Sequence, residues 1–151
     1  MKKKLTHLDD ENRPAMVDIT SKPVSYRLAE ASGFIHLNPQ TVRLIADNQI
    51  KKGEVLLTAE LAGVSAAKRT AYLIPLCHQL LLSKARVKTE LRDDGVLAVS
   101  EMRCVGQTGV EMEALTAVSV ALLTIYDMCK AVDKQMRIGD IVLLKKTKAS
   151  S

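Results

Sequence analysis

The residues best suited to chemistry are cations and carboxylates near the ends of predicted helices and in loops. Asp127 and Lys130 are three residues apart in a helical stretch, so a carboxylate and an ammonium share one helix face. Basic side chains hold phosphate, while Asp, His or a Lys of lowered pKa can move protons. Such a set suits an anionic substrate that undergoes proton transfers. Its members are Lys52, Lys68, Arg69, His78, Glu111, Glu113, Asp127 and Lys130.

Each of these residues also has an ordinary structural explanation. Lys52 lies in a loop of two lysines, and Lys68 and Arg69 end a predicted helix, where cations suit the helix dipole and could equally hold a phosphate. His78 follows Pro75, which stops that helix and makes a rigid corner. A histidine there is more often structural than catalytic. Spacing alone favours a local surface ion pair for Asp127 and Lys130.

Composition excludes several classes of protein. The chain has a net charge of +5, but residues 1–15 and 145–151 hold seven of its 22 basic and three of its 17 acidic residues. The remaining body has a net charge of +1, which argues against nucleic-acid binding. Three cysteines without a CxxC spacing predict neither a disulfide framework nor a zinc site, and we expect reduced thiols in a cytoplasmic protein. Nucleotide-binding, P-loop and hydrolase motifs are absent from the sequence.

The long helix expected over residues 109–134 organises the chain. Residues 114–126 carry no charge, so its apolar surface surrounds the helix and must be covered on all sides. We expect a sheet on one side and a second subunit on the other. A membrane span needs roughly 20 apolar residues, and this uncharged run is much shorter.

Alternation and turn residues predict the other elements. The expected strands are 24–37, 83–92, 96–105 and 141–144, and the expected helices are 38–48, 54–72 and 109–134. With the first two helices counted as one crossover, the order is βαββαβ, an α+β ferredoxin-like plait with helices on one face of an antiparallel sheet. We expect a single catalytic domain over 16–144, between a flexible segment 1–15 and a flexible basic tail 145–151.

Local signals fix some element ends. Asn38-Pro39 predicts a helix start, and Thr108 with Glu111 predicts a capping box. Ser32-Gly33 predicts a bulge, and residues 93–95 predict a hairpin turn. Small residues of the second helix predict close packing against a neighbour.

Four segments together resemble one known family. They are MVDIT at 16–20, KGE at 52–54, LIPLCH at 73–78 and TGVEMEALTAVSVALLTIYDMCKAVDK at 108–134. The chain is identified through them, over roughly residues 5–144, as similar to cyclic pyranopterin monophosphate synthases, the C proteins of molybdenum cofactor biosynthesis.

The resemblance implies a ferredoxin-like fold, a homohexamer built as a trimer of dimers, and active sites at a subunit interface. It also implies a small-molecule substrate, cyclised dihydro-GTP, made from GTP by a radical S-adenosylmethionine partner enzyme. That triphosphate is rearranged to cyclic pyranopterin monophosphate with release of pyrophosphate, and the implied step needs no metal or organic cofactor.

Matching the motifs residue by residue implies roles. Asp127, Lys130 and Lys52 resemble the family's catalytic residues. The residues that resemble its substrate contacts are Leu76, Cys77, His78, Glu111, Met112, Glu113, Lys68 and Arg27. Three departures stand out: Gln79 replaces a usual Pro, Ala71-Tyr72 differs from the usual residues after KRT, and the glycine-rich lysine tail is shortened.

Two other functions fit a small basic plait. An RNA-binding module would stack bases on sheet aromatics, but residues 96–105 contain none. A small-molecule regulatory module would bind a ligand without turnover and would not need the Asp127 and Lys130 pair. Salt-dependent RNA retention would distinguish the first, and binding without turnover the second.

Overall fold

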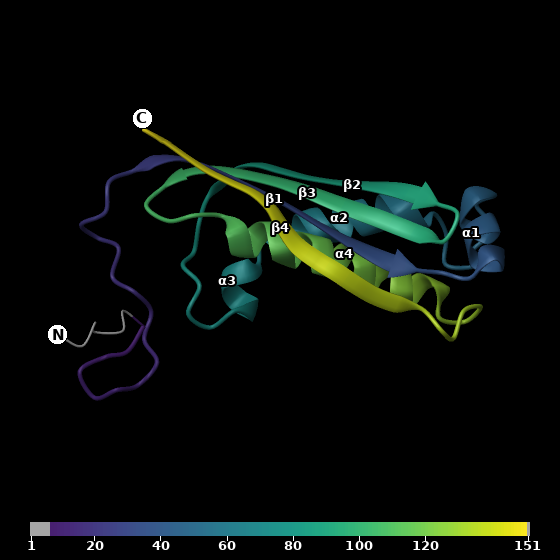
Figure 1. Ribbon diagram of the computed structural model, residues 1–151, viewed down its shortest axis with the longest axis horizontal. Helices are drawn as coiled ribbons and strands as arrows, with labels where there is room; N and C mark the ends of the chain where they lie inside the picture. The colour runs from purple at the N-terminus through teal and green to yellow at the C-terminus, as the bar shows by residue number, and fades with distance from the viewer. Residues whose placement is uncertain (1–6, 151) are drawn as a thin grey trace.

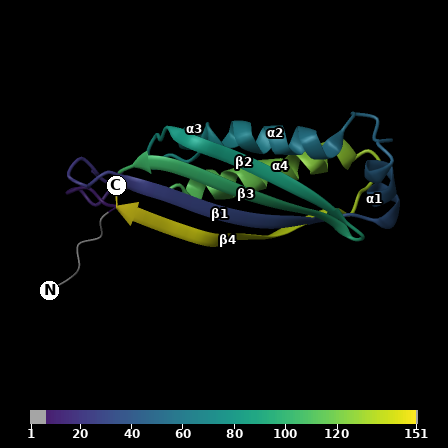
Figure 2. The same ribbon diagram turned by 90° about the horizontal axis from the view of Figure 1, so that it is seen from above.

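The computed structural model describes residues 7–150, which form a four-stranded antiparallel sheet with strand order β2-β3-β1-β4 and helices packed on one face (Figures 1 and 2). The elements in chain order are β1 Ser25–His36, α1 Pro39–Ala46, α2 Val55–Ala67, α3 Thr70–Leu73, β2 Leu82–Arg92, β3 Gly95–Gly106, α4 Glu111–Cys129 and β4 Arg137–Ser150. The predicted α+β class and the antiparallel sheet are confirmed.

Strand β1 lies in the middle of the sheet and faces α4 through small and aliphatic residues. Ala29, Ala31 and Ile35 alternate along it and are completely buried. Gly33 continues this face, and a Cβ there would lie 2.7 Å from Val118 Cγ1. The absence of a side chain at Gly33 therefore lets α4 approach the sheet closely. The pairing with β4 shifts register between Ser32 and Phe34, which confirms the predicted irregularity at this point.

Helix α4 forms the centre of the core, with the sheet on one side and α2 on another (Figure 2). Its fully buried residues are Ala114, Ala117, Val118, Ala121, Leu122, Ile125 and Cys129. Gly63 of α2 faces this helix, because a Cβ there would lie 2.8 Å from the backbone oxygen of Ala117. The predicted close approach through small residues of the second helix is confirmed.

One side of α4 remains outside this packing. Leu123 is 57% exposed, and Met112 and Tyr126 are each 37% exposed. At 19 residues with a mean hydropathy of 1.4, α4 is long and apolar enough to cross a membrane by length and composition, contrary to the expectation that its run is too short. Half of that window is buried within the fold, as in the core helix of a sheet-and-helix protein.

The ends of α4 differ from the predicted ones. The helix stops at Cys129, five residues early. The turn after it is tighter than α-helix, because the Cys129 carbonyl accepts the amide of Val132 at 3.0 Å, three residues on, as well as that of Asp133. At its start the N-cap is Val110, without a side-chain cap, so the predicted Thr108 capping box is wrong. A contact between distant segments joins the C-terminal turn, since Asp133 accepts the amide of Asn38. The expected helix 54–72 likewise divides into α2 and α3.

Strand β4 is much longer than predicted. It pairs with β1 as far as Ser25 and Ser150, so residues 145–150, which we expected in a flexible tail, are strand. Pairing with the free edge of β1 satisfies backbone groups that would otherwise need water, which explains the extension. Ser151 lies outside the described residues.

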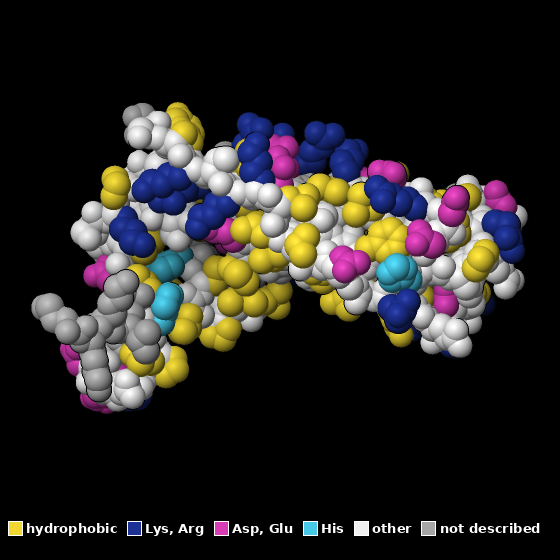
Figure 3. All heavy atoms as spheres, in the orientation of Figure 1, with side chains coloured by type: hydrophobic (Ala, Val, Ile, Leu, Met, Phe, Trp, Pro, Cys, Tyr) yellow, Lys and Arg dark blue, Asp and Glu magenta, His cyan; other side chains and the backbone are white. Residues whose placement is uncertain are grey.

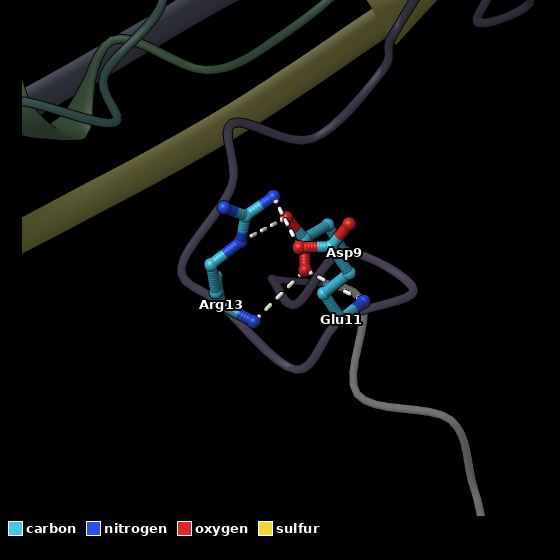
Figure 4. Close-up of polar contacts among 3 residues, drawn as sticks. All are labelled: Asp9, Glu11 and Arg13. Carbon is cyan, nitrogen blue, oxygen red and sulfur yellow. Dashed lines mark hydrogen bonds and ion pairs between the residues drawn. The ribbon is translucent and has the colours of Figure 1, made fainter.

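Residues 1–6 of the expected flexible N-terminal segment lie outside the described residues. The rest of that segment forms a hydrogen-bonded loop around Asp9, whose Oδ1 accepts the amides of Glu11 and Arg13 at 2.9 Å (Figure 4). The Arg13 guanidinium also forms ion pairs with the carboxylates of Asp9 and Glu11. Residues 7–15 therefore have a defined local structure.

The packing of α4 predicts a large effect for one substitution. Leu122→Ala removes a completely buried side chain and should lower the free energy of unfolding by about 2–5 kcal/mol, measured by urea denaturation. Leu61→Ala is the matched control, because Leu61 is 69% exposed on α2 and should change stability by less than about 0.5 kcal/mol. Equal effects of the two substitutions would contradict the central place of α4 in the core.

Candidate functional site

Asp127, Lys130 and Lys52 meet at the C-terminal end of α4, and we call them the lysine–aspartate cluster. Lys130 Nζ lies 2.8 Å from Asp127 Oδ1, and Lys52 Nζ lies 2.8 Å from Asp127 Oδ2. Lys52 Nζ also donates to the backbone oxygen of Asp127 at 3.1 Å. One carboxylate is thus shared between two ammonium groups. All three side chains are about half exposed, so a ligand can reach them.

Two distant parts of the chain supply this cluster. Asp127 lies in the last turn of α4 and Lys130 is its C-cap, which gives the predicted i, i+3 pair. Lys52 comes from the loop before α2, where Gly53 has a φ of +108° that an L side chain rarely adopts. The carbonyl groups at the end of α4 attract a cation, so the Lys52 ammonium is stabilised there. Spacing in the sequence could not predict that contact.

The two lysines fix the charge of Asp127. Its pKa is lowered to about 2, first by the hydrogen bond from Lys130 and then by the one from Lys52. In return, the Asp127 carboxylate raises the pKa of Lys130. A Lys130 of lowered pKa, one of the options from sequence, is therefore wrong for this arrangement. The cluster is ionised at neutral pH, with Lys130 as proton donor or fixed positive charge.

A second group, which we call the α4-start cluster, lies at the opposite end of α4. Lys146 of β4 pairs with Glu111, with 2.5 Å between Nζ and Oε1. Glu113 is only 3% exposed, and its Oε2 is buried without a hydrogen-bond partner. The charges of both glutamates act on the thiol of Cys77, and that of Arg27 acts on Glu111.

The two glutamates of this cluster titrate in opposite directions. Burial raises the pKa of Glu113, and the neighbouring charge of Glu111 adds to the effect. Burial would also raise the pKa of Glu111, but its bond to Lys146 and the charge of Arg27 help to hold that pKa below the usual value. The pKa values of these two carboxyl groups are thus shifted apart, as they are in many pairs that carry out acid–base catalysis.

The cysteines at this end of the molecule are not prepared for nucleophilic chemistry. Burial, followed by the charges of Glu113 and Glu111, raises the pKa of Cys77. The pKa of Cys104 is also raised, chiefly by burial. Both thiols are therefore protonated at neutral pH, while nucleophilic attack and metal binding use the thiolate. Within residues 7–150, no three His, Cys, Asp or Glu side chains are grouped to hold a metal ion.

The N-terminal segment before β1 is attached to the same end. His78 Nε2 lies 2.6 Å from the Val17 backbone oxygen, and Gln107 Nε2 donates to the Thr20 oxygen at 3.1 Å. Arg27 Nη2 donates to the Gln107 oxygen at 3.4 Å, while its Nε is buried without a partner. The MVDIT segment thus contributes to this end of the molecule through its backbone.

The remaining expected contacts lie at the surface. Lys68 is the exposed C-cap of α2, and Leu76 and Met112 are 40% and 37% exposed. Lys146 was not among the predicted site residues, because it lies in the segment predicted to be a flexible tail. Lys146 lies opposite Ala29, on the face that carries α4, but a register shift between Glu30 and Ala31 puts it there, so alternation along β4 would not have predicted its position.

The two clusters are far apart in one chain. Asp127 lies sixteen positions after Glu111 in α4, which corresponds to about 24 Å along the helix axis. A single small substrate cannot contact both ends of one α4. Each end of the helix therefore offers only part of the residue set that the sequence predicted.

Comparison with known proteins settles the family. Residues 16–149 match the MoaC family. The chain belongs to the MoaC family. It is 54% identical over 151 residues to the cyclic pyranopterin monophosphate synthase of Parvibaculum lavamentivorans, which covers 99% of this chain and 94% of that protein.

Other similar proteins have the same or related names. The cyclic pyranopterin monophosphate synthase of Listeria monocytogenes is 53% identical over 97% of this chain and 92% of its own length. Molybdenum cofactor biosynthesis protein 1 of Drosophila melanogaster is 50% identical over 95% of this chain, which corresponds to 26% of that longer protein. The family resemblance drawn from the four sequence segments is confirmed for this MoaC chain.

The lysine–aspartate cluster predicts a specific acid titration. Folding lowers the pKa of Asp127 from 3.8 to about 2, so the stability that the ionised cluster contributes is present above pH 3.8 and is lost as the pH falls through about 2. Carboxyl ¹³C NMR should show this midpoint, and Lys130→Met should raise it more than Lys52→Met. Lys51→Met, a change of the adjacent lysine, is the control. If neither Lys130→Met nor Lys52→Met changed the midpoint of the Asp127 titration, the two ion pairs would be excluded.

Proposed function

We propose that this chain converts cyclised dihydro-GTP to cyclic pyranopterin monophosphate with release of pyrophosphate, a step of molybdenum cofactor biosynthesis. Membership of the MoaC family and the names of its relatives support the pathway and the product. The single observation that carries the chemistry is the carboxylate of Asp127 held between the ammonium groups of Lys130 and Lys52. These three residues are the ones that match the family's catalytic motif.

The proposed reaction needs positive charge around the leaving pyrophosphate. Closing a cyclic monophosphate requires a hydroxyl of the substrate to displace pyrophosphate from the α-phosphorus, and negative charge accumulates on the leaving group. Fixed cations at that position stabilise the transition state more than the ground state. Lys52 and Lys130 supply two such charges, and Lys68, Arg27 and Lys146 supply others at the other end of the fold.

Proton transfer falls to groups in different states of protonation. Asp127 is ionised and Lys130 is protonated, so we assign to them the acceptor and donor ends of a proton relay. Their ion pair must open before either exchanges a proton at neutral pH, because it lowers the pKa of the acceptor and raises that of the donor. In the α4-start cluster we assign the proton-donor role to Glu113, whose pKa is raised by burial, and the acceptor role to Glu111, whose pKa is lowered. We assign to these two glutamates and to His78 the orientation of the pterin-forming base, with Leu76, Cys77 and Met112 at its edge.

The proposed assembly is a homohexamer, a trimer of dimers, of ferredoxin-like plaits with active sites between subunits. The strand order β2-β3-β1-β4 with antiparallel neighbours supports the plait. The separation of the two clusters by about 24 Å supports a site completed by a second copy.

Exposed apolar surface supports the same assembly. Leu123 of α4 is open to solvent, and four consecutive residues of β4, Ile141 to Leu144, are 38–56% exposed. Hydrophobic side chains gather along the middle of the face that β4 crosses (Figure 3). A surface of this kind, in the middle of an edge strand, is typical of a protein interface.

The substrate implies a preceding enzyme. Cyclising GTP between its ribose and base is radical chemistry, so we propose a radical S-adenosylmethionine enzyme as the functional partner. We place both reactions in the cytoplasm, where the three free cysteines stay reduced.

Purified wild-type protein should release pyrophosphate from cyclised dihydro-GTP. Asp127→Asn and Lys130→Ala should each lower kcat at least about a hundredfold. The first removes the proton acceptor, and the second removes a cation that stabilises the negative charge developing on the leaving group. Size-exclusion chromatography should show the oligomer unchanged. Lys51→Ala is the control and should keep full activity. Wild-type turnover with an equally active Asp127→Asn variant would remove Asp127 from the mechanism.

A mixing experiment tests the shared site. Lys130→Ala and Glu111→Ala variants, each inactive alone, should regain about a quarter of wild-type activity when co-expressed in equal amounts, since random pairing restores a quarter of the interface sites. Two tags would verify that mixed oligomers form. Mixed oligomers without activity would place each complete site within one chain.

A further inference from the structure

Asp133, four residues beyond the end of α4, is a charged residue inside the protein. It is 2% exposed, and the described residues offer it backbone amides but no cation. Its Oδ2 accepts the amide of Asn38 at 2.9 Å, and its Oδ1 accepts the amide of Gln135 at 3.2 Å. Burying a carboxylate is costly unless its oxygens are hydrogen-bonded, so these two amides are essential to its position.

On one side, Asp133 holds the turn that carries half of the lysine–aspartate cluster. Its own amide and that of Val132 both donate to the Cys129 carbonyl at 3.0 Å, which winds the chain tightly after α4. Lys130 lies within that turn, with its amide bonded to the Tyr126 oxygen at 2.9 Å. A displacement of Asp133 is therefore transmitted directly to Lys130.

On the other side, Asp133 holds the segment that leads to Lys52. Asn38 donates its amide to Asp133 and uses its side chain to cap α1, with Oδ1 accepting the Thr41 amide at 2.7 Å. Thr41 is completely buried, so the start of α1 is fixed in the core. The chain then runs through α1 and a short hydrogen-bonded loop, in which Gln49 donates to Leu44, to Lys52.

We propose that Asp133 is a positioning residue that sets the two lysines of the cluster around Asp127. Through the Asn38 amide it ties the turn after α4, which carries Lys130, to the start of α1, from which the chain runs on to Lys52. This inference rests on the proposed function only for its consequence for turnover.

Lys134 offers a competing explanation, because its Nζ donates to the Lys130 oxygen at 2.6 Å. Lys134 is exposed and bonds only within its own turn, whereas Asp133 is buried and bonds to a segment 95 residues earlier. Of these two residues, Asp133 is the one that bonds to the segment leading to Lys52. Lys134→Met is therefore the appropriate comparison for any variant of Asp133.

A pair of variants at Asn38 isolates the critical hydrogen bond. Asn38→Ala removes the cap of α1 but keeps the amide, whereas Asn38→Pro removes both the cap and the amide. Proline fits because the φ of Asn38 is −71°. Asp133→Asn keeps one side-chain oxygen as an acceptor and replaces the other oxygen with an NH₂ donor. This third variant tests the same bond from the other side.

The readout is the titration of Asp127 by carboxyl ¹³C NMR, which responds to the lysine positions and not to stability as such. We expect Asn38→Pro and Asp133→Asn to raise its midpoint from about 2 toward 3.8, with Asn38→Ala and Lys134→Met close to wild type. Equal midpoints in Asn38→Pro and Asn38→Ala, or a wild-type midpoint in folded Asp133→Asn, would overturn the proposal.

Turnover adds a second measurement. A misplacement near 1 Å costs on the order of a hundredfold in rate, so Asp133→Asn should lower kcat about tenfold or more with little change in KM. Asp9→Asn, another aspartate that accepts backbone amides, should be fully active. A wild-type protein without turnover would contradict the proposed function alone, since the Asp127 titration still decides the role of Asp133. A normal kcat in Asp133→Asn would contradict that role in catalysis.

Discussion

The burial of α4 is the constraint on which the rest of the molecule depends. A helix with no charge over thirteen residues cannot face water, and this chain covers it with β1 and β3 on one side and α2 on another. The approach is close because Gly33 and Gly63 have no side chains where the helix passes. With its middle filled by aliphatic packing, α4 can carry polar chemistry only at its two ends.

The two ends of α4 place carboxylates in contrasting electrostatic environments. Glu111 and Glu113 lie in the first turn, where the helix dipole favours negative charge. Asp127 lies in the last turn, where the dipole opposes it, and the two lysines offset that cost. The two lysines of the lysine–aspartate cluster therefore stabilise a carboxylate that the helix dipole alone would destabilise. They also concentrate positive charge at a solvent-exposed surface.

Carboxylates of the same chemistry reach opposite protonation behaviour through burial and partners. Asp127 is exposed and doubly paired, so its pKa falls to about 2. Glu113 is enclosed with one oxygen unbonded, so its pKa rises. Desolvation dominates in the second case and paired charge in the first. A carboxyl group of lowered pKa and one of raised pKa thus lie at opposite ends of one helix.

The sequence by itself determined the central helix, the alternating strands, the Asn38 cap and the Asp127–Lys130 spacing, because periodicity and turn chemistry are local properties. Its motifs also determined the family. Only the tertiary structure decided where α4 ends, how far β4 runs, that Lys146 reaches Glu111 and that Lys52 joins Asp127. Those features depend on contacts between distant segments, such as Lys52 and Asp127, which are 75 residues apart. Such contacts compete with local propensity and leave no periodic signal in the chain.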